Sequence, residues 1–216
     1  LSRVSDDAKK AVAIEINCET DFVARNDDFQ AQADRFLNAA YEGNINNVDD
    51  LLKADVNGKS IEDHLQEMVG KIGEKIEIST CILVTTEGAI IDYIHAGNQL
   101  GVLAEFDGSI DNEDVARDVA MQVAAMNPLA VTREEVDSTT VEKELEIAKE
   151  QLINEGKPAE IAEKAAQGKL RRFYEERVLL EQKFVKDTGV TVKQYLEQNN
   201  TPLVKSFHRI QLGEEA

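Results

Sequence analysis

The sequence predicts an α+β protein with two related subdomains, in which small antiparallel sheets are flanked by helices, plus an inserted antiparallel coiled-coil hairpin. Three observations lead to this prediction. Segments with apolar alternation at strand spacing are interspersed with segments that carry apolar stripes at helical spacing. A strand–helix pair at 12–41 resembles a second pair at 101–126, a similarity that either duplication or common supersecondary patterning explains. Two charge-rich helical segments flank a Gly-Lys-Pro turn at 156–158.

Composition and charge favour a protein-binding role. The 216 residues are 42% apolar, which is enough for one or two hydrophobic cores. The net charge of −18 opposes contact with phosphate backbones, so direct nucleic-acid binding is not expected. Residues 139–186 carry equal numbers of acidic and basic side chains, so the negative charge belongs to the rest of the chain. An acidic body of this kind suits a partner with a basic surface.

In the N-terminal half, a strand at 11–17 is followed by a polar turn and then by helices. Asn26 and Ser60 are predicted helix N-caps, and Asn57-Gly58 is a predicted turn. The expected helices span about residues 26–42, 48–53 and 60–72. The expected buried face of the last helix consists of Ile61, Leu65, Met68, Val69 and Ile72.

The C-terminal half begins with three apolar segments separated by short turns, which together predict an antiparallel meander. These strands are expected at 75–85, 89–95 and 100–106. A helix at 113–126 should then bury Val115, Val119, Val123 and Met126 before Asn127-Pro128 breaks it. After residue 185 we expect a strand-like stub, a helix at 191–198 and a final alternating strand at 203–212.

The region between these parts predicts a helical hairpin that is about two heptads long in each arm. The first arm carries apolar residues at spacings of four, three and four, namely Val141, Leu145, Ala148 and Leu152. The apolar residues of the second arm are Ile161, Ala165, Leu170, Phe173 and Tyr174.

No pattern for enzyme chemistry or for membrane insertion is present. The histidines and the two cysteines, Cys18 and Cys81, lack metal-ligand spacing, and there is no phosphate-binding glycine loop or nucleophile elbow. Both cysteines follow apolar strand patterns and are expected to be buried thiols in a reducing compartment. Acidic neighbours should also suppress the thiolate of Cys18. No stretch approaches the roughly 18 apolar residues of a membrane span.

Phe22 is the strongest candidate for a binding residue. It lies in a polar turn beside acidic residues, and the positions of a hydrophobic staple around Asn26 are Arg25 and Gln30, so Phe22 and Val23 lack an obvious local partner. An exposed aromatic of this kind suits an anchor that inserts into a partner's pocket. The run Thr20-Asp21-Phe22-Val23-Ala24-Arg25 closely resembles the signature of the elongation factor Ts family.

Two further segments carry the resemblance. Residues 93–103 are similar to the family's Tyr-x-His turn followed by Gly-Val-Leu, although Gln99 departs from the basic residue that members often carry. The turn at 155–158 and the following Ile-Ala-Glu-Lys at 161–164 are similar to the family's coiled-coil arm. The similarity covers residues 11–213, nearly the whole chain.

The resemblance implies a domain organisation. Residues 1–10 would be the linker from a missing N-terminal ubiquitin-associated-like module. Residues 11–85 would form the N-terminal core subdomain and 86–138 the first part of the C-terminal one. The hairpin would occupy 139–180, and 181–216 would complete the C-terminal subdomain and tail.

The resemblance also implies a function, namely guanine-nucleotide exchange on the GTPase elongation factor Tu. The factor would displace Mg²⁺ and GDP from its partner indirectly, without a catalytic residue, metal or cofactor of its own. The implied partner-binding residues are Thr20, Asp21, Phe22, Val23, Arg25, His95, Leu100 and Gly101. The protein would act in the bacterial cytoplasm, or in the matrix of a mitochondrion or plastid. The alternative is a structural or ribosome-associated binding protein that kept the fold and lost exchange.

Overall fold

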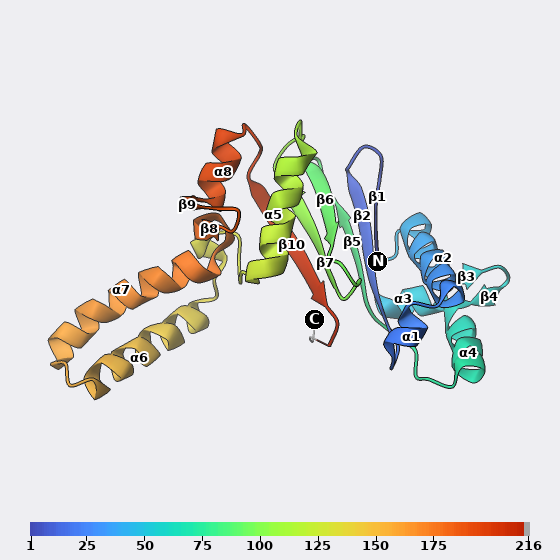
Figure 1. Cartoon of the computed structure of the whole chain (residues 1–216), viewed down its shortest axis with the longest axis horizontal. Coiled ribbons are helices and arrows are strands. Elements are labelled where there is room, and N and C mark those ends of the chain that lie inside the picture. The colour runs from blue at the N-terminus through green and yellow to red at the C-terminus, as the bar shows by residue number, and fades with distance from the viewer. Residues whose placement is uncertain (214–216) are drawn as a thin grey trace.

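Two three-stranded antiparallel sheets form the centre of the computed structural model, which describes residues 1–213. The N-terminal sheet has the order β1 (Ser2–Val4), β2 (Lys10–Asn17) and β5 (Glu77–Thr85). The C-terminal sheet has the order β6 (Ala89–Ile94), β7 (Leu100–Phe106) and β10 (Val204–Gln211). Helices cover the outer side of each sheet, so the predicted α+β class is confirmed (Figure 1).

Both sheets are built in the same chain order. In each sheet, the chain first forms a hairpin whose second strand is the central strand of the sheet. A helix and then further inserted elements follow, and a third strand finally pairs with the other edge of the central strand. The helix is α2 (Asp27–Gly43) in the first unit and α5 (Glu113–Met126) in the second. The shared order includes more elements than the strand–helix pair that is repeated in the sequence, and it supports two related subdomains.

This shared order corrects the interpretation of residues 1–10 as a linker. Ser2 pairs with Ala13 and Val4 with Ala11, so β1 is an integral strand of the first sheet and occupies the position that β6 has in the second. The pairing satisfies backbone groups along one edge of β2, which would otherwise need water.

Side chains of β2 alternate between two cores. Val12 and Ile14 pack against the N-terminal helices, whereas Ala11 and Ala13 face the other sheet. The second core lies between the sheets and includes Leu103 of β7. The alternation expected for β2 is therefore correct, and its second face is buried as well because the small alanines let the two sheets approach closely.

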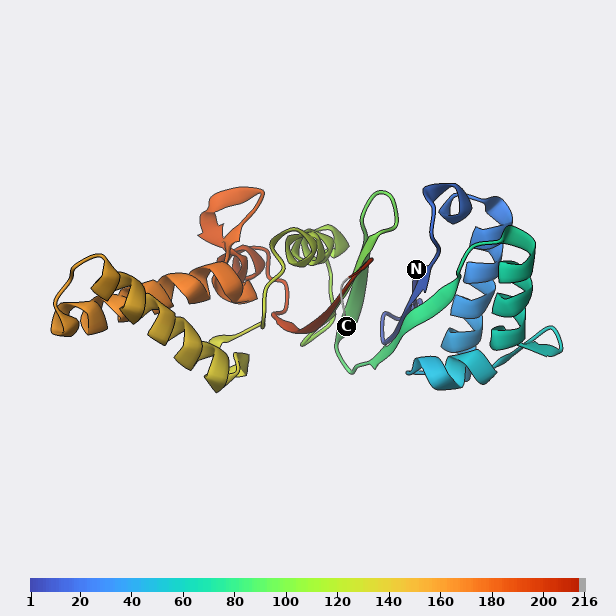
Figure 2. The ribbon, with the colours of Figure 1, turned by 90° about the horizontal axis from the view of Figure 1, so that it is seen from below.

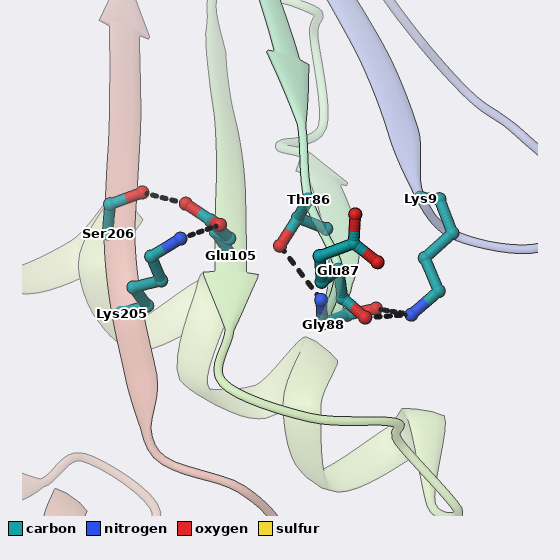
Figure 3. Close-up of polar contacts among 7 residues, drawn as sticks. All are labelled: Lys9, Thr86, Glu87, Gly88, Glu105, Lys205 and Ser206. Atoms are coloured by element: carbon teal, nitrogen blue, oxygen red, sulfur yellow. Dashed lines mark hydrogen bonds and ion pairs between the residues drawn. The ribbon is translucent and has the colours of Figure 1, made fainter.

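The expected meander is wrong, because its first strand belongs to a different sheet. β5 pairs with β2, while β6 pairs with β7. Where the chain passes from β5 to β6, the Lys9 ammonium donates to the carbonyls of Glu87 and Gly88 (Figure 3). A Cβ at Gly88 would overlap the carbonyl oxygen of Phe106. These contacts direct the chain from one sheet to the facing one instead of into a hairpin.

The N-terminal helices begin and end at residues with suitable caps. The Asn26 side chain accepts hydrogen bonds from the amides of Asp28 and Phe29, and Ser60 accepts one from Asp63. The remaining short elements are α1 (Asp21–Ala24), α3 (Val48–Lys53), β3 (Asp55–Val56), β4 (Lys59–Ser60) and α4 (Ile61–Ile72).

Three residues expected in the core are partly exposed. Val69 and Ile72 of α4 each keep 37% of their surface exposed, and Met126 of α5 keeps 41%. Val69 and Ile72 lie in the last turn of α4, and Met126 is the last residue of α5. These side chains at the helix ends are therefore less covered than residues such as Leu65 and Val119 further inside each helix.

The helical hairpin projects from the C-terminal unit, at the opposite end of the molecule from α2 and α4 (Figure 2). Its arms are α6 (Ser138–Asn154) and α7 (Ala159–Arg177), and Gly156 in the turn has φ +83°. The buried residues between the arms are Ala148, Leu152, Ala162 and Ala166. The prediction for Ile161 is wrong, because it is 56% exposed and Ala162 takes the buried position, whereas Ala165 packs against this core as expected.

The hairpin also ends earlier than the predicted residue 180. Val178, Leu179 and Leu180 are buried, and the latter two belong to the core of the C-terminal unit. The amides of Leu179 and Leu180 bond to the carbonyls of Ala130 and Val131. The other elements are η1 (Arg133–Glu135), η2 (Leu179–Glu181), β8 (Lys183–Phe184), β9 (Asp187–Thr191) and α8 (Val192–Gln198).

Candidate functional site

Residues 19–25, here called the presenting turn, lie between the end of β2 and the start of α2. They form the one-turn helix α1 rather than the irregular polar turn that we predicted. Thr20 caps this helix, since its hydroxyl accepts a hydrogen bond from the amide of Val23 at 3.4 Å. The amide of Asn26 donates to the carbonyl of Val23, so α1 leads directly into the cap of α2.

Phe22 and Val23 point in different directions. The side chain of Val23, for which no local staple partner was expected, packs against the core of the N-terminal unit. Phe22 is 89% exposed, the highest value among the large apolar residues that are exposed in residues 1–213. Val23 therefore attaches the presenting turn to the protein, and the ring of Phe22 is held out in solvent.

Glu74 holds the start of the presenting turn. Its carboxylate accepts hydrogen bonds from the amides of Glu19 and Thr20, at 3.2 and 3.0 Å, and from the Thr20 hydroxyl at 2.6 Å. In the other direction, the Lys75 amide donates to the Glu19 carboxylate at 3.1 Å. Glu74 follows Gly73, the left-handed cap of α4. Nothing in its sequence context indicates this contact, because it joins residues 54 positions apart.

The charged residues of the presenting turn are available to a partner. Asp21 and Arg25 lie 3.8 Å apart on α1, and their side chains are 70% and 81% exposed. An ion pair this exposed contributes little to stability. Either charge can therefore exchange its present contact for one with a partner at small cost.

Cys18 immediately precedes the presenting turn in the chain. Its thiol donates to the carbonyl of Thr20 at 3.4 Å. Burial raises the pKa of the Cys18 thiol, and the nearby Glu74 carboxylate raises it further. The predicted suppression of the thiolate is confirmed, although burial contributes more than the acidic neighbours.

The second predicted segment is the turn between β6 and β7. His95 is exposed directly after β6, and its ring Nδ1 shares a hydrogen bond of 2.8 Å with the Tyr93 hydroxyl. The His95 amide donates to the carbonyl of Leu100, while Gly97 and Asn98 adopt positive φ to close the turn. The Tyr93 hydroxyl thus orients the imidazole, and within residues 1–213 the Nε2 atom of His95 has no hydrogen-bond partner.

Leu100 and Gly101 begin the central strand β7 and are half-buried. Gly101 pairs with Ile94 on one side and with Ile210 on the other. A Cβ at Gly101 would lie 3.0 Å from the end of the Ile94 side chain. Gly101 therefore has a packing role within the sheet.

The two predicted segments line the same cleft, which has a volume of about 700 Å³. Thr20, Asp21 and Arg25 line it from the presenting turn, and Leu100 and Gly101 line it from β7. Phe22, Val23 and His95 are not among the lining residues. The charged residues of the lining are Glu15, Glu19, Asp21, Arg25 and Asp34. Acidic groups predominate, which suits the basic partner surface expected from the composition.

Two other kinds of feature, a metal centre and a membrane-spanning helix, are absent from residues 1–213. Within residues 1–213, no three His, Cys, Asp or Glu side chains are grouped as metal ligands. Over the same residues, no helix has both the length and the hydrophobicity to cross a bilayer.

Comparison with known proteins decides the family. Residues 19–214 match the protein family described as Elongation factor TS. The chain belongs to the elongation factor Ts family. Elongation factor Ts of Christiangramia forsetii is 45% identical over 216 residues, which cover 99% of this chain and 77% of that protein. The Flavobacterium psychrophilum protein is 44% identical with the same coverage, and the Amoebophilus asiaticus protein is 41% identical over 217 residues, covering 99% and 78%. This family membership confirms the predicted resemblance and connects the chain with translation elongation.

Proposed function

We propose that this protein binds elongation factor Tu in its GDP state and promotes release of the nucleotide. The proposal rests on membership of the elongation factor Ts family and on one structural observation. Phe22, the aromatic residue of the family-like signature, is 89% exposed on the one-turn helix α1, whose N-terminus is capped by Thr20. An exposed aromatic on a rigid support has little conformational entropy to lose when it enters a pocket.

The proposed contact surface combines the two segments at the cleft. Thr20, Asp21, Phe22, Val23 and Arg25 belong to the presenting turn, and His95, Leu100 and Gly101 to the turn and strand on the other side. Of these, Thr20, Asp21, Phe22, Arg25 and His95 are exposed and contribute side chains, whereas Val23 and Gly101 support the backbone of the two segments. The hairpin provides a second contact at a distance from the cleft.

The mechanism follows from linkage and needs no covalent chemistry. If the chain binds elongation factor Tu more tightly when its nucleotide pocket is distorted, GDP must be weakened by the same factor. Insertion of Phe22 would displace elements of the partner that hold the phosphates and Mg²⁺. Loss of Mg²⁺ removes a large local positive charge from the phosphate site. Exchange is accelerated in both directions, and the excess of GTP over GDP sets the net direction.

A scaffold on the same fold is the alternative. Such a protein would bind elongation factor Tu or the ribosome through the same surfaces and leave the nucleotide in place. The exposed Phe22 favours exchange, because a wedge into a pocket changes the partner's shape whereas a flat docking surface does not. By the same proposal, the protein works in the bacterial cytoplasm or in the matrix of a mitochondrion or plastid, and the bacterial sources of the relatives named above favour the first.

Fluorescent GDP bound to elongation factor Tu tests the proposal. We expect this chain to accelerate the loss of the fluorescence signal in proportion to its concentration, up to a plateau. A parallel binding titration, monitored by a label on elongation factor Tu, separates the two alternatives. Binding without accelerated release would identify a scaffold, and absence of binding would overturn both.

A further inference from the structure

Glu74 is the residue that connects the presenting turn with the rest of the N-terminal unit. It lies after α4, half-buried, and its carboxylate receives three hydrogen bonds from Glu19 and Thr20. The Thr20 hydroxyl that donates to Glu74 also accepts from the amide of Val23, so one hydroxyl links the carboxylate with the first turn of α1.

The presenting turn needs such support. A single helical turn does not persist by itself, because nucleation fixes several backbone dihedral angles for one hydrogen bond. On the inner side Val23 supplies apolar contact, and at the C-terminal end Asn26 and Gln30 bond to the carbonyls of Val23 and Ala24. At the N-terminal end, side-chain support comes from Glu74 through its bonds to residues 19 and 20.

The bonds of Glu74 contribute little to global stability. They are solvent-exposed, and hydrogen bonds and ion pairs at the surface have small net free energies. Their effect is local, because they select one orientation of α1 relative to α4. A contact that is weak for folding but specific in direction suits the placement of a binding side chain.

We infer that Glu74 is a positioning residue for Phe22, which sets the orientation of the ring toward the partner without touching the partner. The inference rests on the proposed function. Glu74, which follows α4 and lies outside the presenting turn, thereby contributes to exchange. A binding side chain interacts well only when supporting contacts hold it to within a fraction of an ångström of the required position.

Two substitutions at position 74 distinguish positioning from charge. Glu74→Ala removes all three hydrogen bonds. Glu74→Gln preserves their geometry, because the amide oxygen accepts from the two backbone amides and the amide nitrogen donates to the Thr20 hydroxyl, which keeps a lone pair for Val23. Glu67→Ala is the matched control, since Glu67 is an exposed carboxylate on α4 whose partner is Lys59.

Release of fluorescent GDP from elongation factor Tu is measured with each variant at a saturating concentration. We expect Glu74→Ala to slow release about fivefold, and Glu74→Gln and Glu67→Ala to stay within about 1.5-fold of the wild type. In a Phe22→Ala background, Glu74→Ala should lose its effect, because a missing ring has no orientation to lose. Hydrogen exchange at the amides of Glu19 and Thr20 should accelerate in Glu74→Ala only.

The outcomes separate this inference from the proposed function. An equal slowing by Glu74→Ala with and without Phe22 would overturn positioning, since Glu74 would then act independently of the ring. Normal release with Glu74→Ala while Phe22→Ala is slow would overturn the inference and leave the proposed function intact. If the wild type itself failed to accelerate release, the proposed function would be wrong and the inference would fall with it.

Discussion

Phe22→Ala is the most informative single substitution, because the structure predicts a large effect on exchange and a small one on folding. With 89% of its surface exposed, the ring contributes little to the core, so we expect the free energy of unfolding to change by less than about 0.5 kcal/mol. The melting temperature of the variant should therefore remain close to that of the wild type.

The exposed area limits the effect on exchange. A phenylalanine presents about 200 Å², and with 89% of it free, full burial at about 25 cal/mol/Å² corresponds to at most about 4.5 kcal/mol. Ordering of groups at the interface and imperfect contact reduce this value. We expect at least about 1.4 kcal/mol to remain, which is a tenfold slower release of GDP.

Stopped-flow release of fluorescent GDP and calorimetry are carried out on the same samples. Leu129→Ala is the control for loss of an exposed apolar side chain, because Leu129 is 50% exposed outside both predicted segments, and its release rate should be unchanged. Phe29→Ala is the control for a buried ring, since Phe29 is 6% exposed, and it should lower stability by about 3–5 kcal/mol. A Phe22→Ala variant with reduced stability and normal exchange would show that Phe22 belongs to the core and that the anchor assignment is wrong.

Three further predictions follow from other parts of the chain. Replacing residues 142–170 with a short Gly/Ser linker should leave the cooperative unfolding of the two sheets and their helices intact, which calorimetry measures. The same change should weaken binding to elongation factor Tu, measured by titration, more than it slows GDP release at saturation. Loss of cooperative unfolding would show that the hairpin is part of the core. Burial opposes ionisation of Glu105, but hydrogen bonds from Lys205, Thr86 and Ser206 outweigh it and hold the pKa of the carboxyl below its ordinary 4.5. The wild type's advantage in melting temperature over Glu105→Gln should therefore be complete above about pH 5 and shrink as the pH falls through the lowered pKa, whereas a constant difference down to pH 3 would contradict this. Burial raises the pKa of Cys81 to about 11, so at pH 8 a thiol reagent should modify Cys18 first and Cys81 only after unfolding, and equally fast reaction of both thiols would be inconsistent with the structure.

Local features were predicted well from the sequence because local chemistry determines them. Asn26 and Ser60 cap helices as expected, and Gly73 ends α4 with a φ of +80°. The fold class also followed from periodicity, because alternation and helical stripes directly reflect which face is buried.

Pairing between distant segments was not predictable in the same way. Three successive strands with short turns suggest a meander, whereas in the structure β6 pairs in a different sheet from β5, and residues 8 and 9 contact residues 86–90 where the chain crosses between the sheets. In the hairpin, Ile161 has the more apolar side chain, yet Ala162 is buried because small residues allow the two helices to approach.

The candidate site shows the same division. The exposure of Phe22 followed from the absence of a staple partner, whereas the packing of Val23 depends on the tertiary core. The contact from Glu74 joins the ends of two helices and has no sequence signal, since a glutamate after a helix is common in so acidic a chain. The cleft that unites the presenting turn with Leu100 and Gly101 requires both sheets in place.

In the proposed mechanism, binding of this protein and binding of GDP to elongation factor Tu oppose each other. The most direct test measures the dissociation constant of the chain from nucleotide-free and from GDP-bound elongation factor Tu, and the dissociation constant of GDP with and without saturating chain. Reciprocity requires the two ratios to be equal, and we predict that both exceed about tenfold, or 1.4 kcal/mol of coupling. Equal affinity of the chain for the nucleotide-free and GDP-bound forms would rule out exchange by this mechanism and would identify the protein as a scaffold.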